Sequence, residues 1–196
     1  MTDDRRMTTD RFYGGISNRL QNLVDMLEYI DQETPSRDEL TSWIISNTNA
    51  GSREAVNHHL PFLDSIELIH LDEKNCSLAS YGKEYSETRD SEVLYEALSN
   101  SVKGFDILLQ ELSKESMTDE DIMNLLVSEF DEAEMTKPGP AIRHREWLQV
   151  LGFVERQDGL NHITEKGSEY LSQYDEDRDK DSVERRKSEL HEFLGG

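Results

Sequence analysis

The feature of this sequence that most constrains its fold is an internal duplication. Residues 16–30 and 98–112 place apolar side chains at matching positions, 82 residues apart. The spacing of these positions is that of one face of a helix. Residues 36–46 and 118–128 match at the same offset. Matches that keep their order along the chain indicate two copies of one folding unit.

The second half of the repeat matches at an offset of 85 residues, after a small insertion. Leu63 then corresponds to Leu148, and GKEY at 82–85 falls on GSEY at 167–170. Each copy is therefore a unit of about 75 residues, with the apolar positions of one copy repeated in the other.

Local signals give the order of elements within each copy as three helices, a strand, a turn, a strand and the start of another helix. Ser36 and Thr118 each precede a helical pattern and have an acidic residue three positions later, which predicts a helix N-cap. Gly152 suits the left-handed position after a helix. Asp158-Gly159 predicts a tight hairpin turn, and residues 72–75 take the same place with a looser turn.

This order resembles the winged helix-turn-helix family, in which a three-helix core is followed by a two-stranded wing. The residues that carry the resemblance are the LGFV run at 151–154, the Asp-Gly turn, and ITEKG at 163–167. The resemblance implies a mainly α fold with small β-hairpins (α+β), made of two tandem winged-helix units plus a C-terminal helix. The arrangement is similar to the tandem units of archaeal regulators and of some defence and restriction proteins.

The repeat divides the chain into four parts. Residues 1–14 are polar and predict a flexible N-terminal arm, residues 15–90 form unit 1, and residues 91–174 form unit 2. Residues 175–196 predict a charged linker and a short amphipathic helix at about 182–194. The apolar side chains of that helix could pack on the body of the protein or on a second subunit, as in a homodimer.

The chain is strongly acidic, with a formal net charge of -21. This bias resembles proteins of halophilic archaea, and an acidic adaptor at ordinary salt is the alternative. At ordinary salt such a charge repels a polyanion. In molar salt the Debye length falls to about 3 Å, so only local contacts count.

The resemblance implies that the third helix of a unit reads the DNA major groove while the wing contacts phosphates. Residues 136–156 carry four basic and two acidic side chains, so this stretch of unit 2 is locally positive in an acidic chain. Arginine suits guanine and phosphate recognition. The alternative is that these cations pair with neighbouring carboxylates. The candidate DNA-binding residues of unit 2, whose third helix is expected at about 139–151, are Lys137, Ile142, Arg143, Arg145, Gln149 and Arg156.

Unit 1 departs from this pattern in its third helix, expected at about 52–63. The candidate DNA contacts there are Arg53, Asn57 and His58, all expected to point outward. Leu60 and Pro61 stand where unit 2 has an arginine and a glutamate. A proline inside a helix removes one hydrogen bond, which predicts a short or bent helix that contacts DNA weakly or forms an interface.

Signals for other chemistry are missing from the sequence. Cys76 is the single cysteine, so no internal disulfide or cysteine-based zinc site is expected. The histidines form no ligand set, and His144 is expected to be packed. No nucleophile–base motif or phosphate loop occurs, so we expect neither an enzyme nor a cofactor or metal. Without an apolar run near 18 residues or a secretory signal, we expect a cytoplasmic protein with no membrane segment.

Two functions remain open from the sequence. The first is a transcription regulator or DNA-recognition component that binds double-stranded DNA mainly through unit 2. The alternative is an acidic interaction module or adaptor that docks a protein partner. Free Arg143 and Arg145 on one convex face favour DNA binding. The same arginines held by carboxylates, or exposed apolar residues at 60–62, favour the adaptor.

Overall fold

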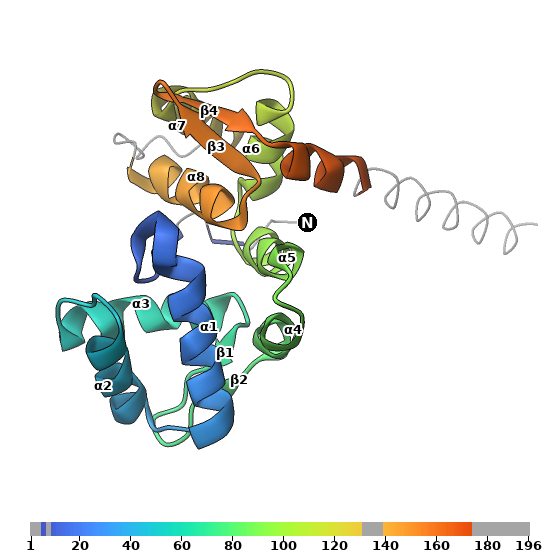
Figure 1. Cartoon of the computed structure of the whole chain (residues 1–196). Coiled ribbons are helices and arrows are strands. Elements are labelled where there is room, and N and C mark those ends of the chain that lie inside the picture. Colours follow the sequence, from blue (N-terminus) through green and yellow to red (C-terminus); the bar gives the residue numbers. More distant parts are fainter. Residues whose placement is uncertain (1–4, 7–8, 131–138, 174–196) are drawn as a thin grey trace, which may run out of the picture.

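A computed structural model describes residues 5–6, 9–130 and 139–173 of the chain. Those residues are mainly helical, with two small antiparallel hairpins, as predicted (Figure 1). The first copy contains α1 Gly15–Glu33, α2 Arg37–Asn47, α3 Arg53–Ser65, β1 Ile69–His70, β2 Ser77–Leu78 and α4 Ser80–Thr88. The second contains α5 Ser91–Ser101, α6 Phe105–Leu112, α7 Asp119–Phe130, α8 Gly139–Leu151, β3 Val154–Gln157 and β4 Leu160–Ile163, after which residues 165–173 are helical.

Matching capping boxes begin the second helix of each copy, as the sequence predicts. The Ser36 hydroxyl accepts from the Glu39 N–H at 3.3 Å, and the Glu39 carboxylate accepts from the Ser36 N–H at 2.9 Å. Thr118 and Asp121 make the same exchange at 3.1 and 2.9 Å. These bonds satisfy backbone donors that have no partner inside the helix.

The turns after the third helix are also alike in the two copies. Gly152 has a φ of 81°, as predicted, and Glu67 takes the same left-handed conformation in the first copy with a φ of 55°. Asp158 and Gly159 have φ values of 53° and 85°. Two consecutive left-handed residues match the twist of a hairpin, so the predicted tight turn is confirmed.

Two glycines at equivalent positions allow the helix after each hairpin to approach the backbone. A Cβ on Gly82 would lie 1.9 Å from the Leu68 carbonyl oxygen, and one on Gly167 would lie 2.4 Å from that of Phe153. Neither distance admits a side chain. The repeated GKEY and GSEY segments therefore mark the same close contact twice.

A third backbone segment extends each hairpin, and no sequence signal predicted it. Met117 and Asn161 form an antiparallel bridge in the second copy, with N···O distances of 3.1 and 2.8 Å. In the first copy the Cys76 N–H donates to the Pro35 carbonyl at 2.7 Å. Proline has no N–H, so it cannot return a second bond.

The expectation of one continuous helix over 98–112 is wrong. The chain breaks between α5 and α6, where Gly104 has a φ of 96° and precedes α6. A Cβ on Gly104 would lie 2.5 Å from Leu126 Cδ2. The break thus lets the chain pass close to a core side chain of α7 in a conformation that favours glycine.

The expectation of a flexible N-terminal arm is also wrong for its described residues. Thr9 and Phe12 are buried, and the Trp147 indole donates to the Asp10 carbonyl at 2.7 Å. Arg6 forms a parallel backbone bridge with Val102. The polar composition did not predict this contact, because backbone hydrogen bonds and one buried ring, that of Phe12, hold the arm in place.

The third helix of the first copy is neither short nor exposed around its proline. α3 has 13 residues with Pro61 inside it, and Leu60 and Phe62 are buried. Pro61 cannot donate to the carbonyl of Asn57 one turn earlier. The Arg37 guanidinium takes that place, with Nη2 3.5 Å from the Asn57 oxygen.

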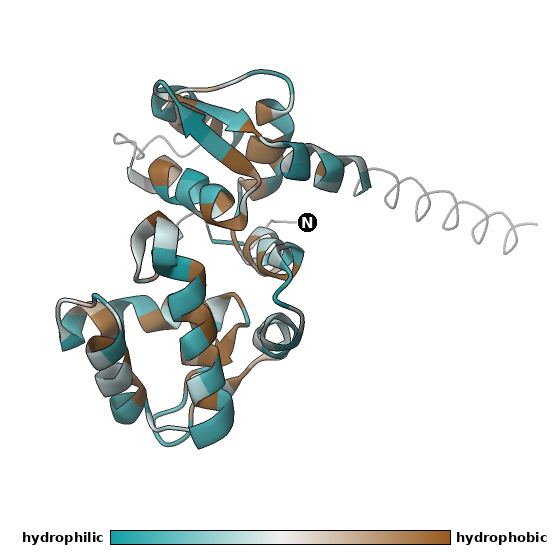
Figure 2. Ribbon diagram, in the orientation of Figure 1, coloured by the Kyte–Doolittle hydropathy of each residue, from teal (hydrophilic) through white to brown (hydrophobic). Residues whose placement is uncertain are grey.

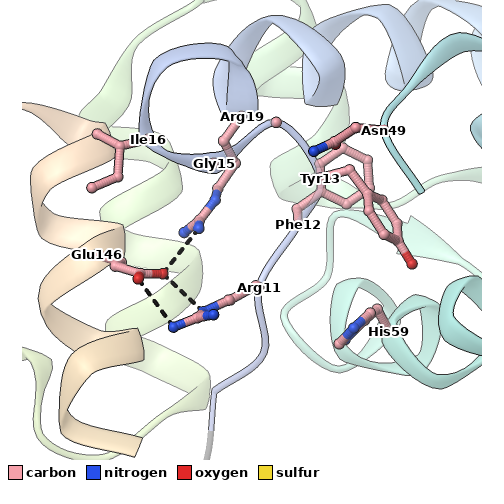
Figure 3. Close-up of a pocket in the computed structure, with 10 residues that line it drawn as sticks. Arg11, Phe12, Tyr13, Gly15, Ile16, Arg19, Asn49, His59 and Glu146 are labelled. Carbon is pink, nitrogen blue, oxygen red and sulfur yellow. Dashed lines mark hydrogen bonds and ion pairs between the residues drawn. The ribbon is translucent and has the colours of Figure 1, made fainter. Parts of the chain in front are cut away.

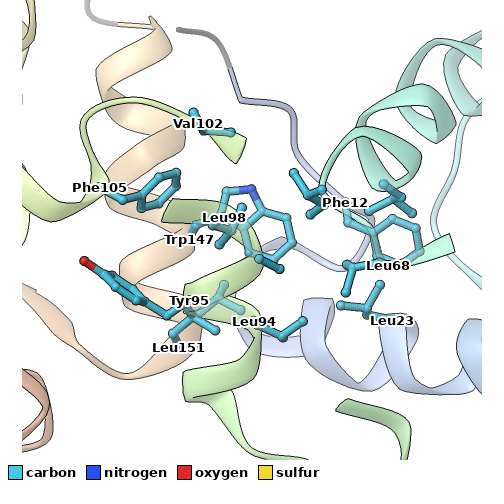
Figure 4. Close-up of a cluster of buried hydrophobic side chains, with 14 of the residues drawn as sticks. Phe12, Leu23, Leu68, Leu94, Tyr95, Leu98, Val102, Phe105, Trp147 and Leu151 are labelled. Atoms are coloured by element: carbon cyan, nitrogen blue, oxygen red, sulfur yellow. The ribbon is translucent and has the colours of Figure 1, made fainter. Parts of the chain in front are cut away.

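The two copies share one hydrophobic core. α5 lies between them, with Leu94 and Leu98 near Leu23 of α1 on one side and Trp147 of α8 on the other (Figure 4). Hydrophobic and hydrophilic bands alternate along α1, as expected for a helix with one buried face (Figure 2). Residues 175–196, including the expected C-terminal helix, lie outside the described residues.

Candidate functional site

α8 is the helix on which the sequence placed most DNA-contact candidates. Its apolar side faces the core, since Ala141, Trp147 and Leu148 are buried. His144 is packed as expected, with Nε2 2.9 Å from the Lys103 carbonyl oxygen. The Trp147 ring also lies 6.2 Å from the Phe62 ring of α3. These two residues are equivalent in the repeat, so matching faces of α3 and α8 meet between the copies.

Arg145, expected outward or on a flank of the helix, is buried. Its side chain is 6% exposed, and Nε and Nη2 each lie 3.3 Å from an oxygen of Asp119 in the first turn of α7. Gln149, one turn along α8, accepts a further bond from Nη1. The guanidinium is thus occupied by partners from its own chain.

The Asp119 carboxylate also contacts both strands of the second hairpin. Arg156 of β3 has Nη2 3.3 Å from Asp119 Oδ2, and Asn161 of β4 has Nδ2 3.1 Å from Oδ1. One carboxylate therefore joins α7, α8 and both strands of the second hairpin. We call Asp119, Arg145, Gln149, Arg156 and Asn161 the Asp119 cluster. Arg37, Leu60, Asp64, Leu71 and Cys76 occupy the corresponding positions of the first copy.

Arg143 is held by the N-terminal arm. Its Nη1 lies 3.3 Å from the Thr9 carbonyl oxygen and 3.6 Å from Asp10 Oδ1, and its side chain remains 40% exposed. His59 Nδ1 lies 3.5 Å from the same Asp10 oxygen. Burial lowers the pKa of His59, although the Asp10 carboxylate opposes that shift. His58, the counterpart of Arg143 in the repeat, is exposed beside His59.

The remaining candidates on α3 contact α2. The exposed Arg53 donates to Asp38 at 2.9 Å and to Ser42 at 2.8 Å. Asn57 Oδ1 lies 3.3 Å from the Thr41 hydroxyl and 3.4 Å from Arg37 Nε. Both side chains therefore help to fix α2 against α3.

The candidates thus fall into separate groups. Arg145, Gln149 and Arg156 come together at Asp119. Arg143 contacts the arm, and His58 lies beside His59. Arg53 and Asn57 of α3 contact α2. Ile142 is half-buried on α8. Lys137 lies outside the described residues.

Sequence reasoning missed an ionic junction between the arm, α1 and α8 (Figure 3). Glu146 of α8 accepts from Arg11 at 2.9 and 3.1 Å and from Arg19 at 3.1 Å. Arg19 is 1% exposed and its Cζ lies 5.0 Å from the centre of the Trp147 ring. A signal existed, because Arg19 is spaced from Leu23, Leu27 and Ile30 as the inner face of α1 requires.

A second feature missed from the sequence is an aromatic pair on the outside of the first copy. The rings of Tyr29 and Trp43 are stacked, with centroids 5.1 Å apart and planes inclined by 11°. Both side chains are half-buried, and together with Asp38 and Glu39 they line an open groove between α1 and α2. No basic side chain is among the described residues that line this groove.

Comparison with known protein families, curated proteins and solved structures finds no match for this chain. Within the described residues, no three His, Cys, Asp or Glu side chains come together as metal ligands. No helix in that part of the chain is long and apolar enough to cross a membrane.

Proposed function

We propose that each copy is a winged helix and that the pair forms an acidic protein-interaction module. The order of helix, strand-like segment, two helices and hairpin supports the fold in both copies, with a full bridge in the second and one hydrogen bond in the first. The bridge before the second helix is especially informative, because it adds a third strand-like segment to the wing. The acidic composition supports operation at high salt, as in halophilic archaea.

The observation that carries the interaction role is the engagement of the α8 arginines by carboxylates of the same chain. Arg145 is buried against Asp119, and Arg143 contacts Thr9 and Asp10. A DNA-reading helix needs its cations available to bases and phosphates. In this protein Arg145 binds Asp119, which also holds the wing, and Arg143 binds the N-terminal arm. The helix α8 therefore acts first as a structural element between the two copies.

The groove beside Tyr29 and Trp43 is the docking face that best fits a partner. A half-exposed stacked aromatic pair can accept an arginine or lysine, and Glu39 adds negative charge, whereas Asp38 already pairs with Arg53. We therefore propose that the partner presents a basic peptide segment. Steering by the overall charge of -21 favours the same kind of partner at moderate salt.

This role can be tested with an arginine-containing peptide and a matched peptide in which glutamine replaces each arginine. The intrinsic fluorescence of the protein reports on docking, because Trp43 is half-exposed while Trp147, the other tryptophan, is buried. We expect the basic peptide to bind and the glutamine peptide to fail.

Trp43→Ala should weaken binding about tenfold, corresponding to about 1.4 kcal/mol of lost cation–π contact. Peptide labelled with a dye provides the readout for this variant. Glu155→Gln, which removes a negative charge from the exposed face of β3, should change binding by less than twofold. Equal binding of both peptides, or of Trp43→Ala and the original protein, contradicts the docking role.

A second candidate, a DNA reader, is favoured by one observation. Arg143 and Arg156 keep 40% and 42% of their side chains exposed despite their ion pairs. Phosphates can replace a carboxylate at such exposed sites. On this reading Arg143→Ala weakens duplex binding by about 1–3 kcal/mol if the arginine pairs with a base. Fluorescence anisotropy of labelled duplex DNA measures that loss directly.

A further inference from the structure

The junction between the two copies contains a pocket of about 310 Å³ (Figure 3). The arm and the start of α1 form one side, and Glu146 of α8 contributes from the other copy. The volume is at the lower end of that of small-molecule sites. The pocket therefore has room for a compact ligand that would touch both copies.

The pocket carries an excess of positive charge. Arg11 and Arg19 line it together with a single acidic residue, Glu146, which both arginines share. Arg11 takes both oxygens of Glu146, so Arg19 is left with one bond to Oε2 through Nη2. One glutamate cannot neutralise two guanidinium groups in a partly enclosed site.

Three buried donors on residues that line the pocket have no hydrogen-bond partner among the described residues. They are Nε and Nη1 of Arg19 and the hydroxyl of Tyr13. A buried polar group without a hydrogen bond is destabilising, and more so when it is charged. Burial also lowers the pKa of Arg19, since Glu146 compensates only part of its lost hydration. Arg19 therefore keeps two unpaired N–H donors although it is only 1% exposed.

The start of α1 adds to the positive potential. Gly14 is the N-cap of this 19-residue helix, and no side chain caps its first turn. A Cβ on Gly14 would lie 2.6 Å from the backbone of Asn18, so the cap position excludes a side chain. Gly14, Gly15 and Ile16 line the pocket, which places the positive end of the helix dipole there.

The other walls are apolar. Phe12 and the ring of Tyr13 line the pocket, and Ile16 is 44% exposed at this position. We propose that the pocket binds a small organic carboxylate with an apolar body. The carboxylate meets Arg11, Arg19 and the start of α1, while the body covers Ile16. Such a ligand bridges the two copies and stabilises their packing, whatever partner the protein docks.

Titration calorimetry of the full chain tests this site with benzoate as the probe. Benzamide has the same shape without the charge, and inorganic phosphate is an oxyanion without an apolar body. All three are compared at one ionic strength, about 0.2 M KCl, so that screening is constant. We expect benzoate to bind and benzamide to give no heat of binding. Phosphate should bind more weakly than benzoate.

Two variants locate the binding. Arg11→Gln should weaken benzoate about tenfold, the loss of one charge-assisted contact. Arg19→Lys keeps the positive charge but loses the planar guanidinium that can bind both carboxylate oxygens. Arg11 is half-exposed, so Arg11→Gln remains informative if Arg19→Lys does not fold. Arg89→Gln is the control, because Arg89 pairs with Glu28 away from the pocket.

Several results overturn the proposal. Failure of folded protein to bind benzoate does so, as does equal affinity for benzoate and benzamide. Unchanged benzoate affinity in Arg11→Gln also overturns it. Tighter binding of phosphate than of benzoate rejects the carboxylate assignment. None of these results bears on peptide docking at Trp43, which lies on a different pocket.

Discussion

Replacing Asp119 by alanine should destabilise the second copy strongly. Arg145 would lose two contacts of 3.3 Å at a position where it is only 5% exposed. Removing one partner of a buried ion pair costs about 3–5 kcal/mol. Gln149 remains as an acceptor and the Asp119 side chain is 17% exposed, so we expect the lower end, about 3 kcal/mol.

Urea unfolding followed by tryptophan fluorescence measures this loss. Trp43→Phe provides a background in which Trp147, on α8, is the sole tryptophan. The free energy of unfolding of Asp119→Ala is compared with that of Glu155→Ala, which removes an exposed carboxylate from β3. Glu155→Ala should change it by less than about 0.5 kcal/mol.

The repeat also suggests a double variant that tests the same reasoning. The first copy has a buried leucine, Leu60, where the second has Arg145. Arg145→Leu combined with Asp119→Ala removes the unpaired, buried guanidinium. About 2 kcal/mol of the lost free energy of unfolding should therefore be recovered. A loss below about 1 kcal/mol in Asp119→Ala would refute the reasoning, because Arg145 would then not depend on that carboxylate.

Further predictions concern packing, capping and titration. Gly167→Ala places a Cβ 2.4 Å from the Phe153 oxygen and should lower stability by about 1–3 kcal/mol. Gly51 has open space around it, so Gly51→Ala should leave stability unchanged. Thermal unfolding compares the two variants. Ser36→Ala should cost about 1 kcal/mol through its lost cap in urea unfolding, and the exposed Ser46→Ala on the same helix serves as its control. Burial lowers the pKa of His59 below its unfolded value near 6.5, so the unfolded state takes up the proton first and stability falls as pH drops below about 6.5. His59→Gln should flatten that part of the pH–stability curve, and an unchanged slope means that another group causes it.

The local signals in the sequence predicted the fold well because they act over a few residues. The capping boxes at Ser36 and Thr118, the left-handed Gly152 and the Asp158-Gly159 turn all appear where expected. Each depends on backbone geometry that neighbouring residues fix. The duplication strengthened these predictions, since equivalent signals occur in both copies.

Long-range contacts could not be predicted in the same way. The charge of Arg145 indicated exposure, but Asp119, 26 residues earlier in the chain, provides a partner that allows burial. Arg19 is buried for the same reason, by Glu146 on the other copy. The Arg19–Glu146 pair depends on how the two copies meet, which no single repeat encodes.

The break at Gly104 shows a limit of the repeat itself. Aligning 98–112 with 16–30 transferred a continuous helix from the first copy to the second, yet Gly104 has no glycine counterpart in that alignment. That mismatch was the available signal. A left-handed glycine overrides the helical spacing of its neighbours because its backbone conformation ends one helix and begins another.

The central claim is that α8 uses its arginines inside the protein and that docking occurs at the Trp43 groove. The most direct test is fluorescence anisotropy of the full chain with labelled duplex DNA and, in parallel, with the labelled arginine peptide. Both titrations are run at low and at molar KCl. We predict peptide binding that requires Trp43, and no duplex binding at either salt. Duplex binding that is lost in Arg143→Ala, with no peptide binding, would contradict the account and assign α8 to DNA.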